Sequence, residues 1–593
     1  MYGYHGCYLR VDVSTGQSDR ISIPQGALRR YLGGSGLGAY LLLEENAAAF
    51  DPLSPEAPIA FTFSPLVGSP LTTSAKFAVV CKSPLTGRFN DSLASSHFAI
   101  AGKKLGCDAI VLVGRAAELS VLILDDDDIR LEPAGDLTGT ACGEAERHLR
   151  DRLGPDFHCC VIGPAGERQV LYATLSHAGR HAGRGGSGTV FGSKNLKALA
   201  VRGTKRSQFA HPQQLAEYAK ALSKKSFGPA TEKYRELGTA TNLLVFNRLG
   251  ALPTRNFQQG TFAAAEAISP EQLSVSRTKT RAYCAACTIG CEHIYSLDEK
   301  KDGEKSDHGN AGGVRVEYEN LFALGPLCDV GDPNIVLRAS RRCDELGIDT
   351  ISTGGTIAFA MECVERGLLD EPWLRFGDGE ALLRAIELIG SREGLGDQLA
   401  EGSRRLAGHI GHDSIYFAPQ VKGLEIPGYE PRALQTMALG FAVGARGADH
   451  NRSGAYEVDF SEQVDRRNVT PAAARLAVET EDRAAVMDSL ILCKFLRGVF
   501  DDFFADAAEM LHLITGWDTT AAEMKETAGR IVTAKKQFNI QAGWTPAEDT
   551  LPERFLTTAL ADDDQAVLTR KRLAALVSAY NVERGWTPDG QIP

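Results

Sequence analysis

The feature that most constrains this chain is a run of three cysteines, Cys284, Cys287 and Cys291, in a C-x2-C-x3-C spacing. Two intervening residues allow both thiolates of a C-x-x-C turn to face one metal centre. Gly290 lets the backbone turn so that the third sulfur can reach the same centre. Three thiolates leave one position of a tetrahedral or cubane site open. We therefore expect a fourth ligand from a distant part of the chain, and Cys493 is the candidate.

The spacing favours a [4Fe–4S] cluster over zinc, because structural zinc usually takes its ligands from two short paired knuckles. From the cysteine pattern alone, zinc and thiols without a metal stay open as alternatives. Thirteen cysteines in 593 residues do not form a disulfide scaffold, and a cytoplasmic location fits the chain best.

Composition excludes several classes of protein. A chain of 593 residues is too long for one hydrophobic core, so several domains are expected. The net charge of -11 argues against nucleic acid as a partner, because phosphate backbones need a basic face. No run of about 18 apolar residues is present, so we expect no transmembrane helix. The first ten residues also lack the basic and apolar parts of a secretory signal.

Sequence periodicity predicts an α+β fold, with an N-terminal β-rich domain followed by two mainly helical domains. The β-rich domain is expected over residues 1–208, where β-branched runs recur at 8–13, 77–81, 109–113 and 119–124. The helical domains are expected over 209–418 and 419–593, because apolar residues there recur at three- and four-residue steps. Their helices are predicted at 215–225, 231–249, 334–346, 353–366, 379–389, 396–408, 433–445, 471–481, 482–496, 501–514, 520–539 and 563–582. Residues 415–421 are predicted as a short strand, and the polar segment 298–313 as an exposed loop.

Four glycine-rich segments with interspersed polar or basic residues lie in the β-rich part, at 64–70, 83–92, 180–188 and 192–197. Backbone N–H groups in such loops bind phosphates, and Arg or Lys adds charge-assisted hydrogen bonds. One such loop alone is also compatible with a plain connection between strands. None has the strand–G-x-G-x-x-G–helix setting of a Rossmann site, so a dinucleotide-binding fold is not expected.

Two hexamers share the pattern D-x-[LV]-x-hydrophobic-[CD]. The first hexamer is residues 344–349, and the second hexamer is residues 488–493, which ends at Cys493. They could mark two related halves that hold two related ligands. From the pattern alone, coincidence stays open as the other explanation.

Together these motifs resemble those of the tungsten-pterin, occasionally molybdenum-pterin, enzymes of the aldehyde:ferredoxin oxidoreductase family. The resemblance runs over nearly the whole chain. Beyond the cysteines and hexamers, it is carried by the segments 183–186, 192–197, 250–257 and 446–450.

The resemblance implies a set of cofactors and their ligands. Cys284, Cys287, Cys291 and Cys493 would bind one [4Fe–4S] cluster. The hexamers would hold two pterins of a bis-tungstopterin (or molybdenum) cofactor, through Asp344, Gly347, Asp349, Asp488 and Leu492. A magnesium ion would bridge the pterin phosphates, near the loops that contain Lys76, Asn90, Ala182, Gly183 and Arg184.

The resemblance also implies a reaction and partners. Glu319 and His450 match the two ionisable groups beside the metal, one as proton acceptor and one as hydrogen-bond donor to the substrate oxygen. An aldehyde would be oxidised to an acid, with electrons passed to a ferredoxin-like carrier or subunit. A homodimer or a heteromer is expected. The alternative within the family is a benzoyl-CoA reductase-type subunit that reduces an aromatic acyl thioester. A bare electron-transfer subunit and a zinc-stabilised scaffold are the alternatives from other classes.

Three positions depart from the family pattern. Lys76 stands where Arg is usual, so a bidentate phosphate contact becomes a single ammonium contact. Ile491 stands where Gly is usual, which affects close backbone approach to the second pterin. Arg338 lies near the position of a Glu that bridges some homodimers through a metal, so that bridge is not predicted.

Overall fold

The N-terminal part of the computed structural model, which describes residues 1–299 and 313–593, contains two mixed six-stranded sheets. The first has the order β2-β1-β6-β3-β4-β5. Its strands are β1 (Cys7–Asp12), β2 (Gln17–Ser22), β3 (Ile59–Thr62), β4 (Lys76–Lys82), β5 (Phe89–Ser95) and β6 (Ala109–Val113). The second has the order β11-β10-β9-β12-β7-β8. Its strands are β7 (Ser120–Asp125), β8 (Asp128–Pro133), β9 (His158–Val161), β10 (Leu175–His177), β11 (Arg180–Ala182) and β12 (Leu196–Arg202).

Both sheets confirm the predicted strands, because the β-branched runs are buried on their faces. Phe61, Phe77, Phe98 and Phe191 pack between the sheets and their helices. The helices of this part are α1 (Gln25–Tyr31), α2 (Gly34–Glu44), α3 (His97–Lys103), α4 (Cys142–Leu153), α5 (Pro164–Glu167) and α6 (Ser187–Gly192).

Helix α2 was not predicted, because its opening G-S-G-L-G sequence has the composition of a loop. The glycines allow close packing instead. A Cβ at Gly38 would lie 2.3 Å from Val80 Cγ2 on β4, and the backbone N–H of Gly36 donates to Ser489 Oγ at 3.0 Å. The helix therefore joins the N-terminal sheet to residues near the second hexamer.

The rest of the chain is largely helical, which confirms the α+β class. Its helices of seven residues or more are α7 (Pro212–Ser226), α9 (Asn242–Arg248), α10 (Pro270–Ser276), α11 (Tyr318–Leu324), α12 (Pro333–Leu346), α13 (Thr350–Glu365), α14 (Gly379–Ser391), α16 (Ser403–Ile410), α17 (Gln435–Val443), α20 (Ala473–Leu490), α21 (Phe503–Thr515), α22 (Ala521–Gln541) and α24 (Arg570–Glu583). Shorter ones are α8 (Glu232–Glu236), α15 (Leu395–Leu399), α18 (His450–Ser453), α19 (Tyr456–Asp459) and α23 (Glu553–Thr557).

Some predicted elements differ from the structure. The two helices expected over 471–496 are mainly one helix, α20. The helices expected over 231–249 and 396–408 are each interrupted, at Gly238 (φ 69°) and Gly402 (φ 82°), where a positive φ ends the helical path. The strand expected over 415–421 is mostly a 3-10 turn at Ser414–Phe417, followed by the short strand β16 (Gln420–Val421) that pairs with β17 (Leu424–Glu425).

A three-stranded antiparallel sheet carries the cysteine run. Its strands are β13 (Arg277–Ala282), β14 (Glu292–Glu299) and β15 (Val314–Val316), and the run lies between β13 and β14. Most of the predicted loop 298–313 lies outside the described residues.

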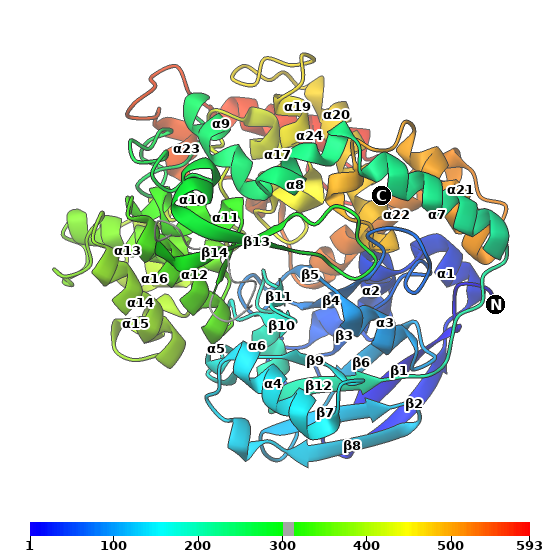
Figure 1. The fold of residues 1–593 in the computed structure, drawn as a ribbon. Helices are drawn as coiled ribbons and strands as arrows, with labels where there is room; N and C mark the ends of the chain where they lie inside the picture. Colours follow the sequence, from blue (N-terminus) through cyan, green and yellow to red (C-terminus); the bar gives the residue numbers. More distant parts are fainter. Residues whose placement is uncertain (300–312) are drawn as a thin grey trace.

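The helical parts stand on the β-rich base, with α10–α16 at the left, α17, α19, α20 and α24 at the top, and α21 and α22 at the right (Figure 1). The end of the chain returns to the base: α20 and α22 pack on α2, and Arg88 pairs with Glu548 at 2.6 Å. This return brings the second hexamer toward the first part of the chain. In the described part of the chain, no helix has the length and apolar character needed to cross a bilayer.

Candidate functional site

A cavity of about 780 Å³ is lined by residues from three stretches of the chain, 76–184, 233–351 and 429–497. Most of the residues singled out from the sequence line it: Lys76, Gly183, Arg184, Cys284, Cys291, Glu319, Asp344, Asp349, His450, Asp488, Leu492 and Cys493. Asn90, Ala182, Gly347 and Cys287 are not among its lining residues. The fold therefore gathers residues that are up to about 400 positions apart in the sequence.

The cavity is basic although the whole chain is acidic. Nine Lys and Arg side chains line it, against six Asp and Glu side chains, while the chain as a whole carries a net charge of -11. Buried positive charge of this kind suits an anionic ligand, because phosphates are bound by Arg and Lys through charge-assisted hydrogen bonds.

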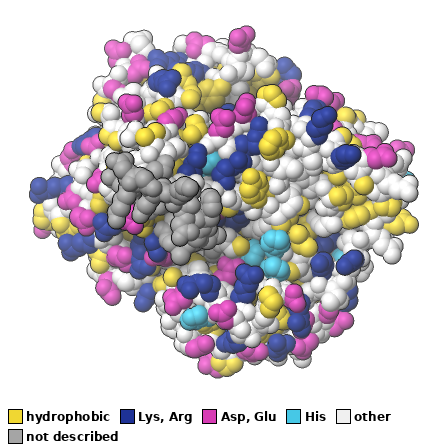
Figure 2. All heavy atoms as spheres, in the orientation of Figure 1, with side chains coloured by type: hydrophobic (Ala, Val, Ile, Leu, Met, Phe, Trp, Pro, Cys, Tyr) yellow, Lys and Arg dark blue, Asp and Glu magenta, His cyan; other side chains and the backbone are white. Residues whose placement is uncertain are grey.

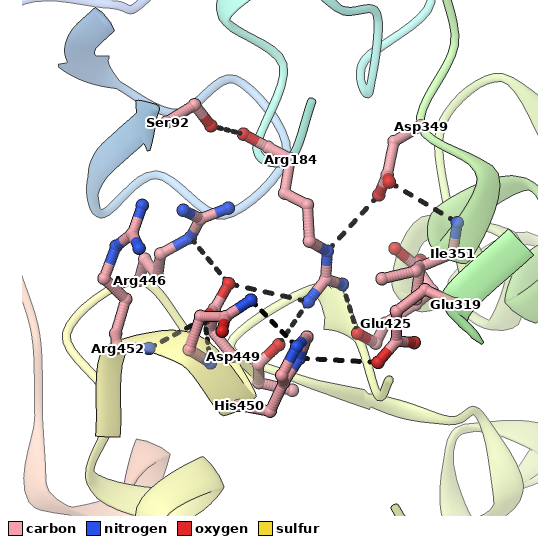
Figure 3. Close-up of polar contacts among 12 residues, drawn as sticks. Ser92, Arg184, Glu319, Asp349, Ile351, Glu425, Arg446, Asp449, His450 and Arg452 are labelled. Atoms are coloured by element: carbon pink, nitrogen blue, oxygen red, sulfur yellow. Dashed lines mark hydrogen bonds and ion pairs between the residues drawn. The ribbon is translucent and has the colours of Figure 1, made fainter. Parts of the chain in front are cut away.

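Glu319 and His450 lie next to each other in the lining of the cavity (Figure 3). Glu319 lies in the first turn of α11 and His450 is the first residue of α18. Glu319 Oε1 lies 3.6 Å from His450 Nδ1. The N–H of Gly428 donates to Glu319 Oε2 at 3.0 Å, whereas Oε1 is buried and, among the described residues, has no hydrogen-bond partner.

Burial shifts both members of this pair toward their neutral forms. It raises the pKa of Glu319 to about 8, partly offset by the N–H of Gly428 and by Arg184. It lowers the pKa of His450 to about 3, although Asp449 acts in the opposite direction. At neutral pH the cavity therefore contains a protonated carboxyl group beside a neutral imidazole.

The tautomer of His450 follows from its neighbour Asn451. The Nδ2 of Asn451 lies 2.8 Å from His450 Nε2, and an amide NH₂ can only donate. Nε2 is then the acceptor, so Nδ1 carries the proton and points to the cavity. The ring is held in place by stacking on Tyr429, with centroids 4.9 Å apart.

Arg184 connects the two sides of the cavity (Figure 3). Its Nε lies 3.4 Å from Asp349 Oδ2, and its Nη1 donates to the carbonyl of Ala448 at 2.6 Å and lies 3.9 Å from Asp449 Oδ2. Asp349 and Asp449 are both helix N-caps, of α13 and α18. One guanidinium thus fixes the helix that follows the first hexamer and the helix that begins with His450.

The two hexamers form the same backbone turn. Each begins in the last turn of a helix, and its fourth residue, Gly347 (φ 73°) or Ile491 (φ 63°), is left-handed. The N–H of the fifth residue donates to the carbonyl of Cys343 in one case and of Met487 in the other. Because both hexamers adopt the same turn, their shared sequence pattern has a structural basis and is not explained by coincidence. Ile491 adopts a φ that β-branched residues rarely adopt.

The cysteine run and the second hexamer meet at one wall of the cavity. Thr73 links them: its N–H donates to the carbonyl of Ala286 at 2.6 Å, and its Oγ1 accepts from the N–H of Cys493 at 3.4 Å. A hydrogen bond between the Cys284 and Cys287 thiols lowers the pKa of Cys284 to about 4 and raises that of Cys287. Among the described residues, no group of three or more His, Cys, Asp or Glu side chains is arranged to hold a metal ion.

Lys76 lines the cavity close to this wall. Burial alone would lower the pKa of its ammonium group, but the thiols of Cys493, Cys284 and Cys291 and the carboxylate of Asp488 raise it above its ordinary value. A cation held among thiols and a carboxylate is suited to balance an anionic ligand.

Comparisons with known proteins identify the family of this chain. Residues 8–203 match the family Aldehyde ferredoxin oxidoreductase, N-terminal domain, and residues 214–593 match Aldehyde ferredoxin oxidoreductase, domains 2 & 3. The chain belongs to the aldehyde ferredoxin oxidoreductase family. It is 36% identical to the tungsten-containing aldehyde ferredoxin oxidoreductase of Pyrococcus furiosus over 611 residues, which cover 100% of this chain and 98% of the relative. It is 35% identical to the enzyme of the same name from Thermococcus kodakarensis, with the same coverage.

A solved structure shares the fold. The active site complex BamBC of benzoyl coenzyme A reductase with 1,5-dienoyl-CoA aligns with a TM-score of 0.82 and 22% identity, over 100% of this chain and 96% of that chain. The family resemblance expected from the motifs is confirmed, and the chain is a tungsten-family oxidoreductase.

The cavity has features that fit a large polar cofactor of this family. Glu319 Oε1 and His450 Nδ1, from two residues that line the cavity, are buried without a hydrogen-bond partner among the described residues. At Gly183, which lines the cavity, an added Cβ would meet no described atom within 4 Å, so the backbone there is open to a ligand. The residues present therefore fit the tungstopterin that the family implies.

Sequence reasoning missed several charged residues of this site. Arg452 donates to Asp91 at 2.7 Å and lies 3.3 Å from Asp488 Oδ2, and Lys535 lies 2.8 Å from Asp91. These cations hold the pKa of the buried Asp91 carboxyl well below its usual range, although burial acts in the opposite direction. The only signal in the sequence was the position of Arg452, two residues after His450.

Proposed function

We propose that this chain oxidises an aldehyde to the carboxylic acid and passes the electrons to a ferredoxin-like acceptor. Its cofactors in this proposal are a tungsten (or molybdenum) bis-pterin, one [4Fe–4S] cluster and a magnesium ion between the pterin phosphates. The observation that carries the proposal is one basic cavity that contains Glu319, His450 and three of the four predicted cluster cysteines. The cytoplasmic location predicted from the sequence suits thirteen free cysteines and a low-potential partner.

The cofactor ligands in this proposal fall into three sets. Cys284, Cys287, Cys291 and Cys493 would bind the cluster. Asp344, Gly347, Asp349, Asp488 and Leu492 would hold the pterins, and Lys76, Asn90, Ala182, Gly183 and Arg184 would surround the phosphates and magnesium. When bound, the tungsten-pterin would supply two-electron redox chemistry and the cluster a one-electron exit.

Glu319 and His450 divide the proton chemistry between them. The reaction is RCHO + H₂O → RCOOH + 2e⁻ + 2H⁺, so a water must lose its protons near the aldehyde carbon. The imidazole of His450 is neutral over the physiological range. Its Nδ1–H can donate a hydrogen bond to the aldehyde oxygen. Glu319 in its carboxylate form can accept a proton from the attacking water, and a pKa of about 8 makes it an effective base near that pH.

The wall beside this pair is aromatic. Tyr429 stacks on His450 and packs against Phe246, whose ring stacks on Phe460 at 5.3 Å. Val245 and Phe460, both exposed, also line the cavity. An aldehyde with an apolar substituent therefore suits the approach to the catalytic pair better than a charged one.

The alternative is a benzoyl-CoA reductase-type subunit, which the shared fold supports but the sequence relatives do not. The two functions differ in substrate and direction. We expect the holoenzyme, purified without oxygen, to reduce benzyl viologen with simple aldehydes such as benzaldehyde or butanal. Reduction of an aromatic CoA thioester with no oxidation of any aldehyde would contradict the proposal and favour the alternative.

A further inference from the structure

The cysteine run lies between the cavity and the protein surface. Cys284 and Cys291 line the cavity, Cys287 is half-buried, and Ala286 at the tip of the turn is exposed. Because electron transfer needs a close approach, a partner protein that collects electrons from this site would contact the surface around this turn.

Two segments border the turn, residues 224–236 and residues 277–283, and we refer to their combined surface as the exit face. Ser226 Oγ lies 2.7 Å from Thr288 Oγ1 in the cysteine run. Arg281 donates to the carbonyls of Ile289 and Gly290 at 3.0 and 3.2 Å. These segments belong to the end of α7, to α8 and to strand β13. All three elements lie on the side of the molecule that faces the viewer (Figure 1).

The exit face is basic in an acidic chain. Six Lys or Arg side chains of its two segments are exposed or half-buried, beside two exposed Glu side chains, while Arg277 is buried. The chain as a whole carries a net charge of -11. Lys224, Lys225 and Arg281 are exposed, and Lys225 pairs at 2.7 Å with Asp501, a neighbouring acidic group that is itself 94% exposed. Lys and Arg side chains are spread around the middle of this view (Figure 2).

The exit face also exposes two large aromatic side chains. Phe227 is 63% exposed and Tyr283 is 54% exposed. The guanidinium of Arg235 lies 4.4 Å from the ring centroid of Phe227, and that of Arg281 lies 5.5 Å from that of Tyr283. Tyr283 is also packed on Gly290 of the cysteine run, where an added Cβ would lie 2.3 Å from its ring. Exposed aromatic and Arg side chains are enriched in protein interfaces.

We propose that the exit face is the docking surface for a small acidic one-electron carrier protein of the iron–sulfur type. The inference rests on the proposed function, because aldehyde oxidation releases two electrons and two protons. Two one-electron carriers must then dock and leave in each turnover, each reduced by one electron. A basic face fits such a partner, since complementary charge speeds encounter while a modest interface permits rapid release.

The test uses the holoenzyme with two electron acceptors, a purified ferredoxin of strongly negative charge and benzyl viologen. In the double variant Lys224→Glu/Lys225→Glu, we expect the KM for ferredoxin to rise about tenfold or more at low ionic strength. The increase should shrink at about 0.5 M salt, where the screening length is only a few ångströms. The kcat with saturating benzyl viologen should stay unchanged, because neither lysine lines the cavity.

The matched control is Arg384→Glu/Lys571→Glu, which makes the same change in charge at exposed positions on α14 and α24. This variant should keep the ferredoxin KM of the unchanged enzyme. An unchanged KM in the lysine variant, or an equal rise in the control, would overturn the docking surface. Absence of aldehyde oxidation with the dye in the unchanged enzyme would contradict the proposed function itself.

Discussion

The two hexamers use one backbone turn to present different chemistry to the cavity. Residues 344–349 and 488–493 both end a helix through a left-handed fourth residue. In the first hexamer the sixth residue, Asp349, caps α13 and contacts Arg184. In the second the sixth residue, Cys493, lies beside the cysteine run through Thr73. The turn therefore places its sixth residue in the lining of the cavity in both hexamers.

The first residues of the hexamers differ in environment. Asp488 is buried between Lys494, at 3.0 Å, and Arg452, at 3.3 Å. Asp344 lines the cavity, where its side chain is 32% exposed and lies 3.3 Å from His181. Partial withdrawal from solvent raises the pKa of this carboxyl to about 7. In the second hexamer the carboxylate of Asp488 is balanced by two cations. In the first hexamer the carboxyl group of Asp344 can take up a proton instead.

The largest expected difference concerns the sixth positions. Cys493→Ser should lower the iron content of the anaerobically purified protein and reduce aldehyde oxidation by on the order of a hundredfold or more, because it removes a proposed cluster ligand. Asp349→Asn should keep the iron content. Iron analysis and dye reduction measure both effects.

Cys7→Ser is the control for the cysteine replacement, since Cys7 is also partly exposed but lies on β1. It should retain iron and activity. Full iron content in the Cys493 variant would show that the two sixth positions do not differ as described.

The second prediction concerns the proposed catalytic pair, in which Glu319 lies on α11 and His450 on α18. Glu319→Gln should keep the metal content and reduce kcat by about 10²- to 10⁴-fold, because the carboxylate that accepts the proton is lost. Glu380→Gln, at an exposed first-turn position of α14, is the matched control and should leave kcat unchanged. Undiminished turnover in the Glu319 variant would remove its assigned role.

The pH dependence follows from the same carboxyl group. The raised pKa means that native Glu319 binds its proton more tightly than the unfolded chain does, so its contribution to stability is present at low pH and is lost as pH rises through about 8. The catalytic rate should change with pH in the opposite direction, because only the ionised carboxylate can accept a proton. We expect kcat/KM of the unchanged enzyme to rise with pH through about 8, and this rise should be absent in Glu319→Gln.

Much of this architecture could be predicted from the sequence, because it depends on local patterns. Strand β6 was predicted at its observed bounds, since a β-branched run marks it clearly. The cysteine spacing and the hexamers identified residues that now line one cavity. Helix α2 was missed because its glycines serve packing against Val80, which no local pattern reveals.

The charged network of the site was harder to predict. Asp91 gathers Arg446, Arg452 and Lys535 from positions more than 350 residues away, and only the fold brings them together. The small sheet β13–β15 around the cysteine run was also missed, because its strands are polar and partly exposed. Periodicity indicates a strand only where one face is buried.

The next prediction compares the first positions of the hexamers. Asp488→Asn should lower the free energy of unfolding by about 2–4 kcal/mol, because it leaves two buried cations with less compensation. Asp344→Asn should change it by less than about 1 kcal/mol, since that carboxyl is partly exposed. Its neighbour His181 is neutral, because burial lowers the pKa of that imidazole to about 4. Denaturant unfolding of the protein without added metal measures both. Equal losses would remove the distinction between the two environments.

The smallest effects are expected at the left-handed fourth positions. Gly347→Ala should cost about 1–2 kcal/mol, because φ is positive and an added Cβ would lie 3.0 Å from Gly163 N and Cys142 Sγ. Ile491→Leu should change stability by less than about 1.5 kcal/mol, because it removes the β-branch at a positive φ and keeps the buried volume. The same unfolding measurement ranks the two variants, and a larger loss for Ile491→Leu would contradict the shared turn.

The central claim is that the cavity between the two hexamers holds a heavy metal on pterins beside an iron–sulfur cluster bound by Cys493. Elemental analysis of the protein purified without oxygen from tungstate-supplemented cells tests this claim most directly. The account predicts about one tungsten or molybdenum and about four iron atoms per chain. Zinc alone, or iron with neither tungsten nor molybdenum in a correctly folded protein, would contradict it.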